Sequence, residues 1–129
     1  LTFVVNGGIA ENAQIAQQLE HLDGAMIGRA AYHHPWRMAE WDTRFLGAAQ
    51  PAAASREQVE ERFVAYMDRI VAQGITWPHA ARHMMGLYDG VPGARRWRQV
   101  WSDHRLKAEP PQRVMALARE GFARAAVAA

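Results

Sequence analysis

Two short apolar runs near the beginning of the chain are each followed by a glycine turn and then by a segment with helical spacing. Leu1–Val5 and Ala25–Ile27 are predicted to be strands, the first of them buried, because both are short, apolar and bounded by turn residues. Apolar residues with helical spacing predict one helix over residues 12–22 and a second over residues 33–46.

This order, strand–turn–helix twice over, is the layout of the last two units of a (β/α)₈ barrel, the TIM barrel. Two strands do not make a barrel, so we expect the chain to be the C-terminal part of a larger protein. The first residue, Leu1, is not a methionine, which favours truncation or processing.

The second part of the chain reads as helical throughout. An Ala- and Pro-rich stretch at 47–54 is expected to be a linker, and no strand signal follows it. Short turns between amphipathic helices predict a four-helix bundle. The predicted fold class is therefore α/β plus all-α, with the end of a TIM barrel in residues 1–50 and the bundle in residues 51–129. The four helices are expected to begin at Ser55, near Pro78, at Pro92 and at Pro110-Pro111.

Two of these helices have clear apolar stripes. The first, opened by a capping box from Ser55 to Gln58 and stopped by Gly74, is expected to bury Val59, Phe63, Tyr66, Met67, Ile70 and Val71. The next helix is expected to be capped by Thr76. The third is expected to reach about His104 and to be anchored by Trp97 and Trp101.

Composition excludes several classes of protein. Half of the 129 residues are apolar, which is enough for a packed core, but no run approaches the roughly 20 apolar residues of a membrane span. No basic leader precedes the first apolar run, so no signal peptide is expected. The chain has no cysteine, which excludes disulfides and thiolate chemistry within it and fits a reducing cytoplasm.

The net charge of +2 conceals an asymmetry. Residues 1–75 carry six Lys and Arg against nine Asp and Glu, whereas residues 76–129 carry nine against four. A basic second part favours an anionic partner, with an ordinary solvated surface as the alternative.

The paired glycine turns predict a phosphate site. The loops after strands 7 and 8 of such barrels commonly bind phosphate, and glycine lets the backbone approach an anion closely. A helix N-terminus and a fixed arginine charge would add to the attraction. The residues concerned are Asn6, Gly7 and Gly8 in the first turn and Gly28 and Arg29 in the second.

Two arginines on the third helix of the bundle form a second candidate site. Arg95 and Arg98 are three residues apart and share a face, Arg105 continues the stripe, and the tryptophan stripe lies beside it. Arginines on a helix anchored by tryptophans suit a phosphate backbone, although a plain surface helix would carry the same pattern. His79 and His83 have the spacing of metal ligands, but no third ligand is evident and no metal is expected.

Four ordered motifs resemble the tRNA-dihydrouridine synthases, most closely the bacterial A-type subfamily. The resemblance covers nearly the whole chain. Its motifs are Asn6-Gly7-Gly8-Ile9, the run from His21 to Tyr32, the run from Ala81 to Tyr88, and the run from Pro92 to Arg98.

The resemblance implies a flavoenzyme that reduces a uridine in tRNA, with FMN recharged by NADPH, and whose helical domain grips tRNA. By motif, Arg95 and Arg98 would contact tRNA, and the FMN phosphate would be held by Asn6, Gly7, Gly8, Gly28 and Arg29. The family's catalytic cysteine and six of its strands would lie upstream of Leu1, so the chain alone should be inactive.

Three alternatives remain open at the level of sequence. The chain is a part of such an enzyme, a free-standing helical RNA-binding module with a barrel remnant, or a phosphate-binding barrel enzyme of another chemistry. The last would not explain the basic helix. Exposed strand edges also predict self-association.

Overall fold

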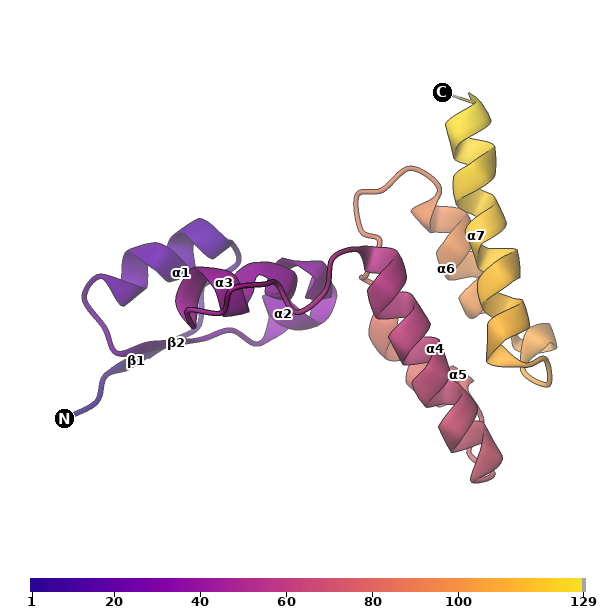
Figure 1. Ribbon diagram of the computed structural model, residues 1–129, viewed down its shortest axis with the longest axis horizontal. Helices are drawn as coiled ribbons and strands as arrows, with labels where there is room; N and C mark the ends of the chain where they lie inside the picture. The colour runs from indigo at the N-terminus through magenta and orange to yellow at the C-terminus, as the bar shows by residue number, and fades with distance from the viewer. Residues whose placement is uncertain (129) are drawn as a thin grey trace. The chain divides into compact units, whose positions relative to one another are not determined.

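The computed structural model describes residues 1–128, which form two compact units that divide between Ala54 and Ser55 (Figure 1). The first unit contains the two strands and several short helices. The second unit is entirely helical.

The first unit is built around two parallel strands. Strand β1 (Val4–Asn6) pairs with β2 (Gly24–Met26), so that Val4 lies opposite Gly24 and Asn6 opposite Met26. Helix α1 (Asn12–Leu19) lies between them in the sequence and is shorter than the predicted segment. Both strands therefore form within three residues of the predicted positions.

The prediction that the first strand is buried is wrong. Phe3 and Val4 are each 57% exposed, and the buried apolar residue of this part is Ile15 of α1. The sheet has two strands in the part of the chain that is described, and α1 contacts β2, so much of the apolar strand surface stays open.

The prediction of one helix over residues 33–46 is also wrong. Three short elements occupy this region: α2 (Arg29–His33), the 3-10 helix η1 (Pro35–Glu40) and α3 (Trp41–Phe45). Pro35 explains the break, because proline lacks a backbone N–H and disfavours helical geometry at the residue before it. His34 accordingly leaves the helical region, with φ −131° and ψ 61°.

The second unit begins with α4 (Arg56–Ala72), and its start is as predicted. The Ser55 hydroxyl accepts a hydrogen bond from the Gln58 N–H at 3.2 Å. The buried face differs from the predicted stripe, since Tyr66 and Val71 are exposed. The residues that α4 buries are Glu60, Val64, Met67 and Ile70.

The remaining predicted helices are shorter or differently bounded. The second is a single turn, α5 (Pro78–Ala81), followed by the 3-10 helix η2 (Arg82–Met84), and the residue before it is Trp77, not Thr76. The third, α6 (Ala94–Trp101), ends before His104, which opens η3 (His104–Leu106). The last is α7 (Pro111–Ala128).

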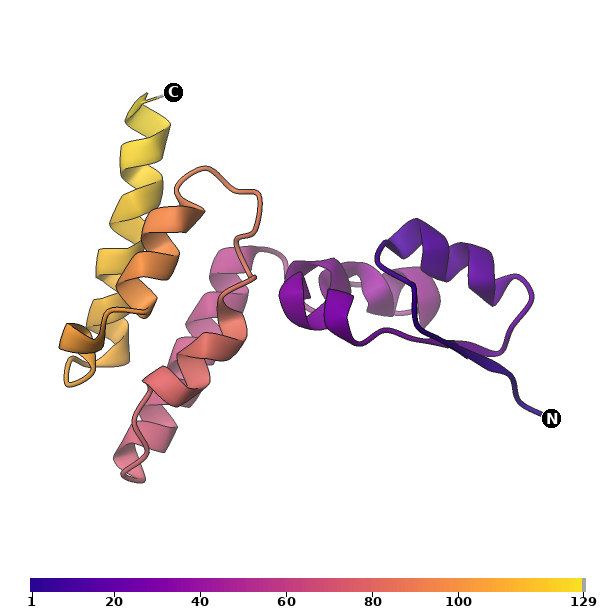
Figure 2. The same ribbon diagram turned by 180° about the vertical axis from the view of Figure 1, so that it is seen from behind.

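Helices α6 and α7 lie side by side, as both ribbon views show (Figures 1 and 2). Two glycines make this possible. A Cβ added to Gly93 would lie 2.8 Å from the carbonyl oxygen of Gly121, and one added to Gly121 would lie 2.9 Å from the Cβ of Arg96. Gly93 also has φ +92°, a value that other residues rarely adopt.

None of the helices in the described residues is both long enough and apolar enough to cross a membrane.

Candidate functional site

The two glycine turns meet at one edge of the two-stranded sheet. Both strands run in the same direction and Asn6 is in register with Met26, so the turns that follow them leave from the same end. Gly7 has φ +101° and Gly8 φ +73°, values that residues with a side chain rarely adopt, so both positions favour glycine. Gly28 behaves differently, because its φ of −103° is accessible to any residue.

The backbone around the first turn is held by side chains from the same unit. The side-chain oxygen of Gln14 accepts hydrogen bonds at 2.9 Å from the N–H groups of Ala10 and Glu11. Arg37 pairs with the Glu11 carboxylate at 2.9 Å and also donates to the carbonyl of Ala10. The start of α1 therefore has internal partners for these amides, and any ligand would meet the amides of the glycine turn instead.

The edge has room for an anion. A Cβ added to Gly7 or Gly8 would meet no atom within 4 Å. Arg29, the first residue of α2, is exposed and forms no ion pair within residues 1–128. Turn amides and an exposed guanidinium on the neighbouring turn are groups of the kind that bind phosphate.

In the helical unit a buried carboxylate ties three helices and a loop together. Glu60 on α4 is 0% exposed, and its two oxygens accept four hydrogen bonds. The Trp97 indole donates to Oε1 at 2.6 Å and the Trp101 indole at 3.3 Å. The Tyr88 hydroxyl donates to Oε2 at 3.0 Å and the Arg119 Nε at 2.8 Å. We call these five residues the Glu60 cluster.

The environment of the Glu60 cluster changes the ionisation of its members. Burial raises the pKa of Tyr88 strongly, and the negative charges of Glu60 and Glu57 raise it further. Burial lowers the pKa of Arg119, but its hydrogen bonds with Glu60 and Glu61 outweigh that effect and raise it overall. The cluster therefore keeps a neutral phenol and a charged guanidinium around one carboxylate.

Glu60 is not among the residues that the sequence motifs single out. The available signal was its spacing, because Glu60, Val64 and Met67 fall at i, i+4 and i+7 on one face of α4. A charged residue can be buried on such a face when it has enough hydrogen-bond donors, as Glu60 has here.

The Glu60 cluster fixes the orientation of α6. Trp97 and Trp101 are 0% and 2% exposed, as the anchoring role predicted for them requires. On the remaining surface of α6, Arg95 is exposed and Arg98 is half-buried, and neither forms an ion pair with any described residue. Two guanidinium groups thus lie on a helix whose buried face is held in place by the Glu60 cluster.

Arg105 does not continue this stripe as predicted. Helix α6 ends at Trp101, and Arg105 lies in η3, where it pairs with Asp103 at 2.8 Å. Its hydrogen bonds lower the pKa of Asp103 to about 2. Arg105 is therefore already partnered by a carboxylate.

His79 and His83 do not form a metal site in the structure. Residues 1–128 contain no group of three side chains placed to ligate a metal ion. His79 lies on α5 and His83 on η2, and the Nε2 of His83 accepts a hydrogen bond from Arg82 at 3.2 Å.

Comparison with known proteins shows the family to which the chain belongs. A model of the dihydrouridine synthase family matches residues 1–125. The chain belongs to the dihydrouridine synthase family.

Several similar proteins carry the name tRNA-dihydrouridine(20/20a) synthase. The protein of Vibrio cholerae is 41% identical over 107 residues, which are 83% of this chain and 32% of that protein. The protein of Pseudomonas syringae is 41% identical over 111 residues, covering 86% and 33%, and that of Salmonella typhimurium 39% over 112 residues, covering 84% and 32%. The chain thus spans about a third of the length of these relatives.

Proposed function

We propose that this chain is the C-terminal part of an FMN-dependent tRNA-dihydrouridine synthase that acts in the cytoplasm. Residues 1–50 would be the last two units of its TIM barrel, and residues 51–129 its helical tRNA-binding domain. The whole enzyme would reduce uridine to dihydrouridine in tRNA with NADPH as the reductant. The relatives named above support this proposal by their similarity along most of the chain.

The glycine edge would hold the FMN phosphate. Backbone amides of Asn6, Gly7 and Gly8 would surround it from the turn after β1, and Gly28 and Arg29 would approach it from the turn after β2. The flavin would supply the hydride for the uracil ring. What this chain contributes is binding and orientation through a rigid turn and one positive charge.

The helical unit would bind tRNA through α6. The observation that carries this proposal is the pair Arg95 and Arg98, which have no carboxylate partner in residues 1–128 and stand on a helix fixed by the Glu60 cluster. Guanidinium groups match phosphate oxygens in charge and geometry, and a rigid helix reduces the entropy lost on binding.

The test is a binding measurement with this chain and an unmodified tRNA transcript at several salt concentrations. Replacing Arg95 and Arg98 together by alanine should weaken binding about tenfold or more and should lower the salt slope by about two, since about one counterion is released per phosphate contact.

The matched control replaces Arg69 and Arg124 by alanine. Both arginines are exposed and lie on other helices of the same unit, so the control removes the same charge. Equal weakening by both pairs would leave only diffuse attraction and would contradict the role proposed for α6.

The free-standing RNA-binding module remains a second candidate, because the Glu60 cluster lies wholly within the unit that begins at Ser55. The encoding gene separates the two. An upstream reading frame with six further β/α units and a loop cysteine would support the enzyme, whereas a start codon near Leu1 would support the module.

A further inference from the structure

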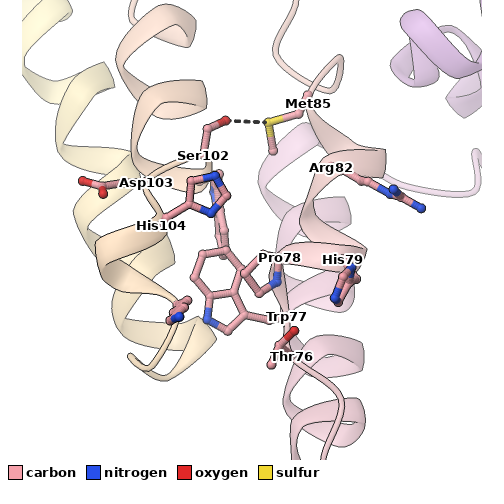
Figure 3. A pocket seen from close by; sticks show the side chains of 11 residues that line it. Thr76, Trp77, Pro78, His79, Arg82, Met85, Ser102, Asp103 and His104 are labelled. Atoms are coloured by element: carbon pink, nitrogen blue, oxygen red, sulfur yellow. Dashed lines mark hydrogen bonds between the residues drawn. The ribbon is translucent and has the colours of Figure 1, made fainter.

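The helical unit has a pocket whose lining does not include Arg95 or Arg98 of α6. It lies between α5–η2 on one side and the end of α6 with η3 on the other, and its volume is about 550 Å³. Figure 3 shows Trp77 among the lining side chains, together with His104 from η3 and His79 from α5. Across the opening, the Ser102 hydroxyl lies 3.8 Å from the sulfur of Met85.

The pocket combines an apolar interior with a basic margin. Trp77 and Trp101 are 1% and 2% exposed, so they form its rigid back wall. Trp77 is itself fixed, because its indole donates to the carbonyl of Glu109 at 3.1 Å. The more accessible lining comes from Pro78 and Met85, with the exposed side chains of His79, Arg82, His104 and Lys107 at the margin. Asp103 also lines the pocket, and Arg105 pairs with its carboxylate at 2.8 Å.

The pocket continues the arginine face of α6. Arg95, Arg98 and Ser102 lie at i, i+3 and i+7, and the N–H of Ser102 bonds to the carbonyl of Arg98 at 3.0 Å. Ser102 therefore extends the same stripe, and it lines the pocket. A strand that follows the arginines along about 10 Å of helix would arrive at this opening.

Resting on the proposed tRNA-binding function, we propose that this pocket receives one unstacked nucleotide of the bound RNA. Its base would lie against Met85, Pro78 and the imidazole of His104, and its phosphate would contact Lys107. Proteins recognise single-stranded RNA by placing splayed bases on aromatic, including histidine, side chains beside a basic groove. The pocket and its charge provide both parts.

The test compares three variants of this chain in tRNA binding at several salt concentrations. Ser102→Phe adds a ring at the opening without changing charge, so affinity should fall at least about fivefold while the salt slope stays the same. His104→Ala should weaken binding in the same way. Lys107→Ala should weaken binding and also reduce the salt slope by slightly less than one.

Two controls make the result specific. Ala65→Phe places the same ring on an exposed position of α4, and it should leave binding unchanged. Circular dichroism and tryptophan fluorescence show whether Ser102→Phe is folded. If Ser102→Phe does not fold, the tRNA affinities of His104→Ala and Lys107→Ala provide the test, because both residues are exposed and their replacement should not disturb the fold.

The possible failures are distinguishable. If replacing Arg95 and Arg98 weakens tRNA binding but all three pocket variants bind like the original chain, the pocket inference is overturned and the proposed function stands. If the chain binds no tRNA, both are overturned. Saturable binding of uridine monophosphate that tRNA does not compete away would show a free-nucleotide site and would also overturn the inference.

Discussion

The carboxylate of Glu60 lies 2.8 Å from the Nε of Arg119, a residue 59 positions later in the chain, and Glu60 is completely buried. The same guanidinium donates to the backbone carbonyl of Glu57 and to the carboxylate of Glu61, both at 3.1 Å. One arginine of α7 thus joins this helix to three residues at the start of α4, Glu57, Glu60 and Glu61, which together span little more than one helical turn.

The first prediction concerns the charge of Glu60. Glu60→Gln keeps the size of the side chain but loses the ion pair with Arg119, and its amide NH₂ would face one of the groups that donate to Glu60. The free energy of unfolding should therefore fall by about 3 kcal/mol. Urea unfolding followed by tryptophan fluorescence measures this. Glu61→Gln, which alters the exposed partner of the same arginine, should cost about 1 kcal/mol or less. Equal losses would show that burial of Glu60 is not what matters.

The second prediction concerns the close approach of α6 and α7. Gly121→Ala would place a Cβ 2.9 Å from that of Arg96, which forces the two helices apart. We expect a net loss of about 1–2 kcal/mol, although alanine favours a helix by about 1 kcal/mol over glycine. Thermal unfolding measures the change. Ala123→Gly, on the exposed side of α7, measures how much the difference in helix propensity between alanine and glycine contributes without the contact. A Gly121→Ala variant that is more stable than the original chain would contradict the close approach of the two helices.

The third prediction concerns pH. Burial beside Glu60 raises the pKa of Tyr88 above its ordinary value of 10.0, so the folded chain holds this proton more tightly than the unfolded chain. The stabilisation is complete below pH 10 and is lost as the pH rises above it, by about 1.4 kcal/mol per pH unit.

Unfolding at a series of pH values in the original chain and in Tyr88→Phe isolates this contribution. The difference in stability between the two should be constant below pH 10 and should shrink above it. Absorbance at 295 nm should show one tyrosine that ionises only when the chain unfolds. A difference that stays constant through pH 11 would count against the prediction.

The fourth prediction concerns FMN. This chain should bind FMN weakly or not at all, because the glycine edge offers contacts to the phosphate, whereas affinity for a small molecule depends on burying most of its surface. Fluorescence titration of the chain with FMN measures the affinity. A submicromolar dissociation constant would mean that a complete pocket exists, for example one formed by self-association.

Sequence patterns predicted best where local chemistry decides the structure. Gly7 and Gly8 adopt positive φ, Ser55 caps α4, and Trp97 and Trp101 are buried, all from signals within a few residues. Pro35 marks the break after His33 in the sequence, but the apolar residues on both sides of it have helical spacing and so predict one continuous helix.

The remaining errors came from partners distant in the sequence. Nothing near Glu60 indicates that Tyr88, Trp97 and Arg119 will surround it, and nothing near Val4 indicates that its strand remains open on one side. Burial of a polar group and exposure of an apolar one are both decided by what the rest of the fold supplies. The roles of the phosphate and tRNA residues stay predictions.

The pairing of Glu60 with Arg119 has a consequence for synthesis on the ribosome. Chains are made from the N-terminus at about 5–20 residues per second, so Trp101 is made about 1–4 seconds before Arg119, and α4 and Trp97 earlier still. Until Arg119 arrives, the carboxylate has no cationic partner, and closing the core over it would strand a charge. Docking of α7 is therefore needed before the Glu60 carboxylate can be buried. A nascent chain that is truncated before Arg119 should leave this core open to proteases.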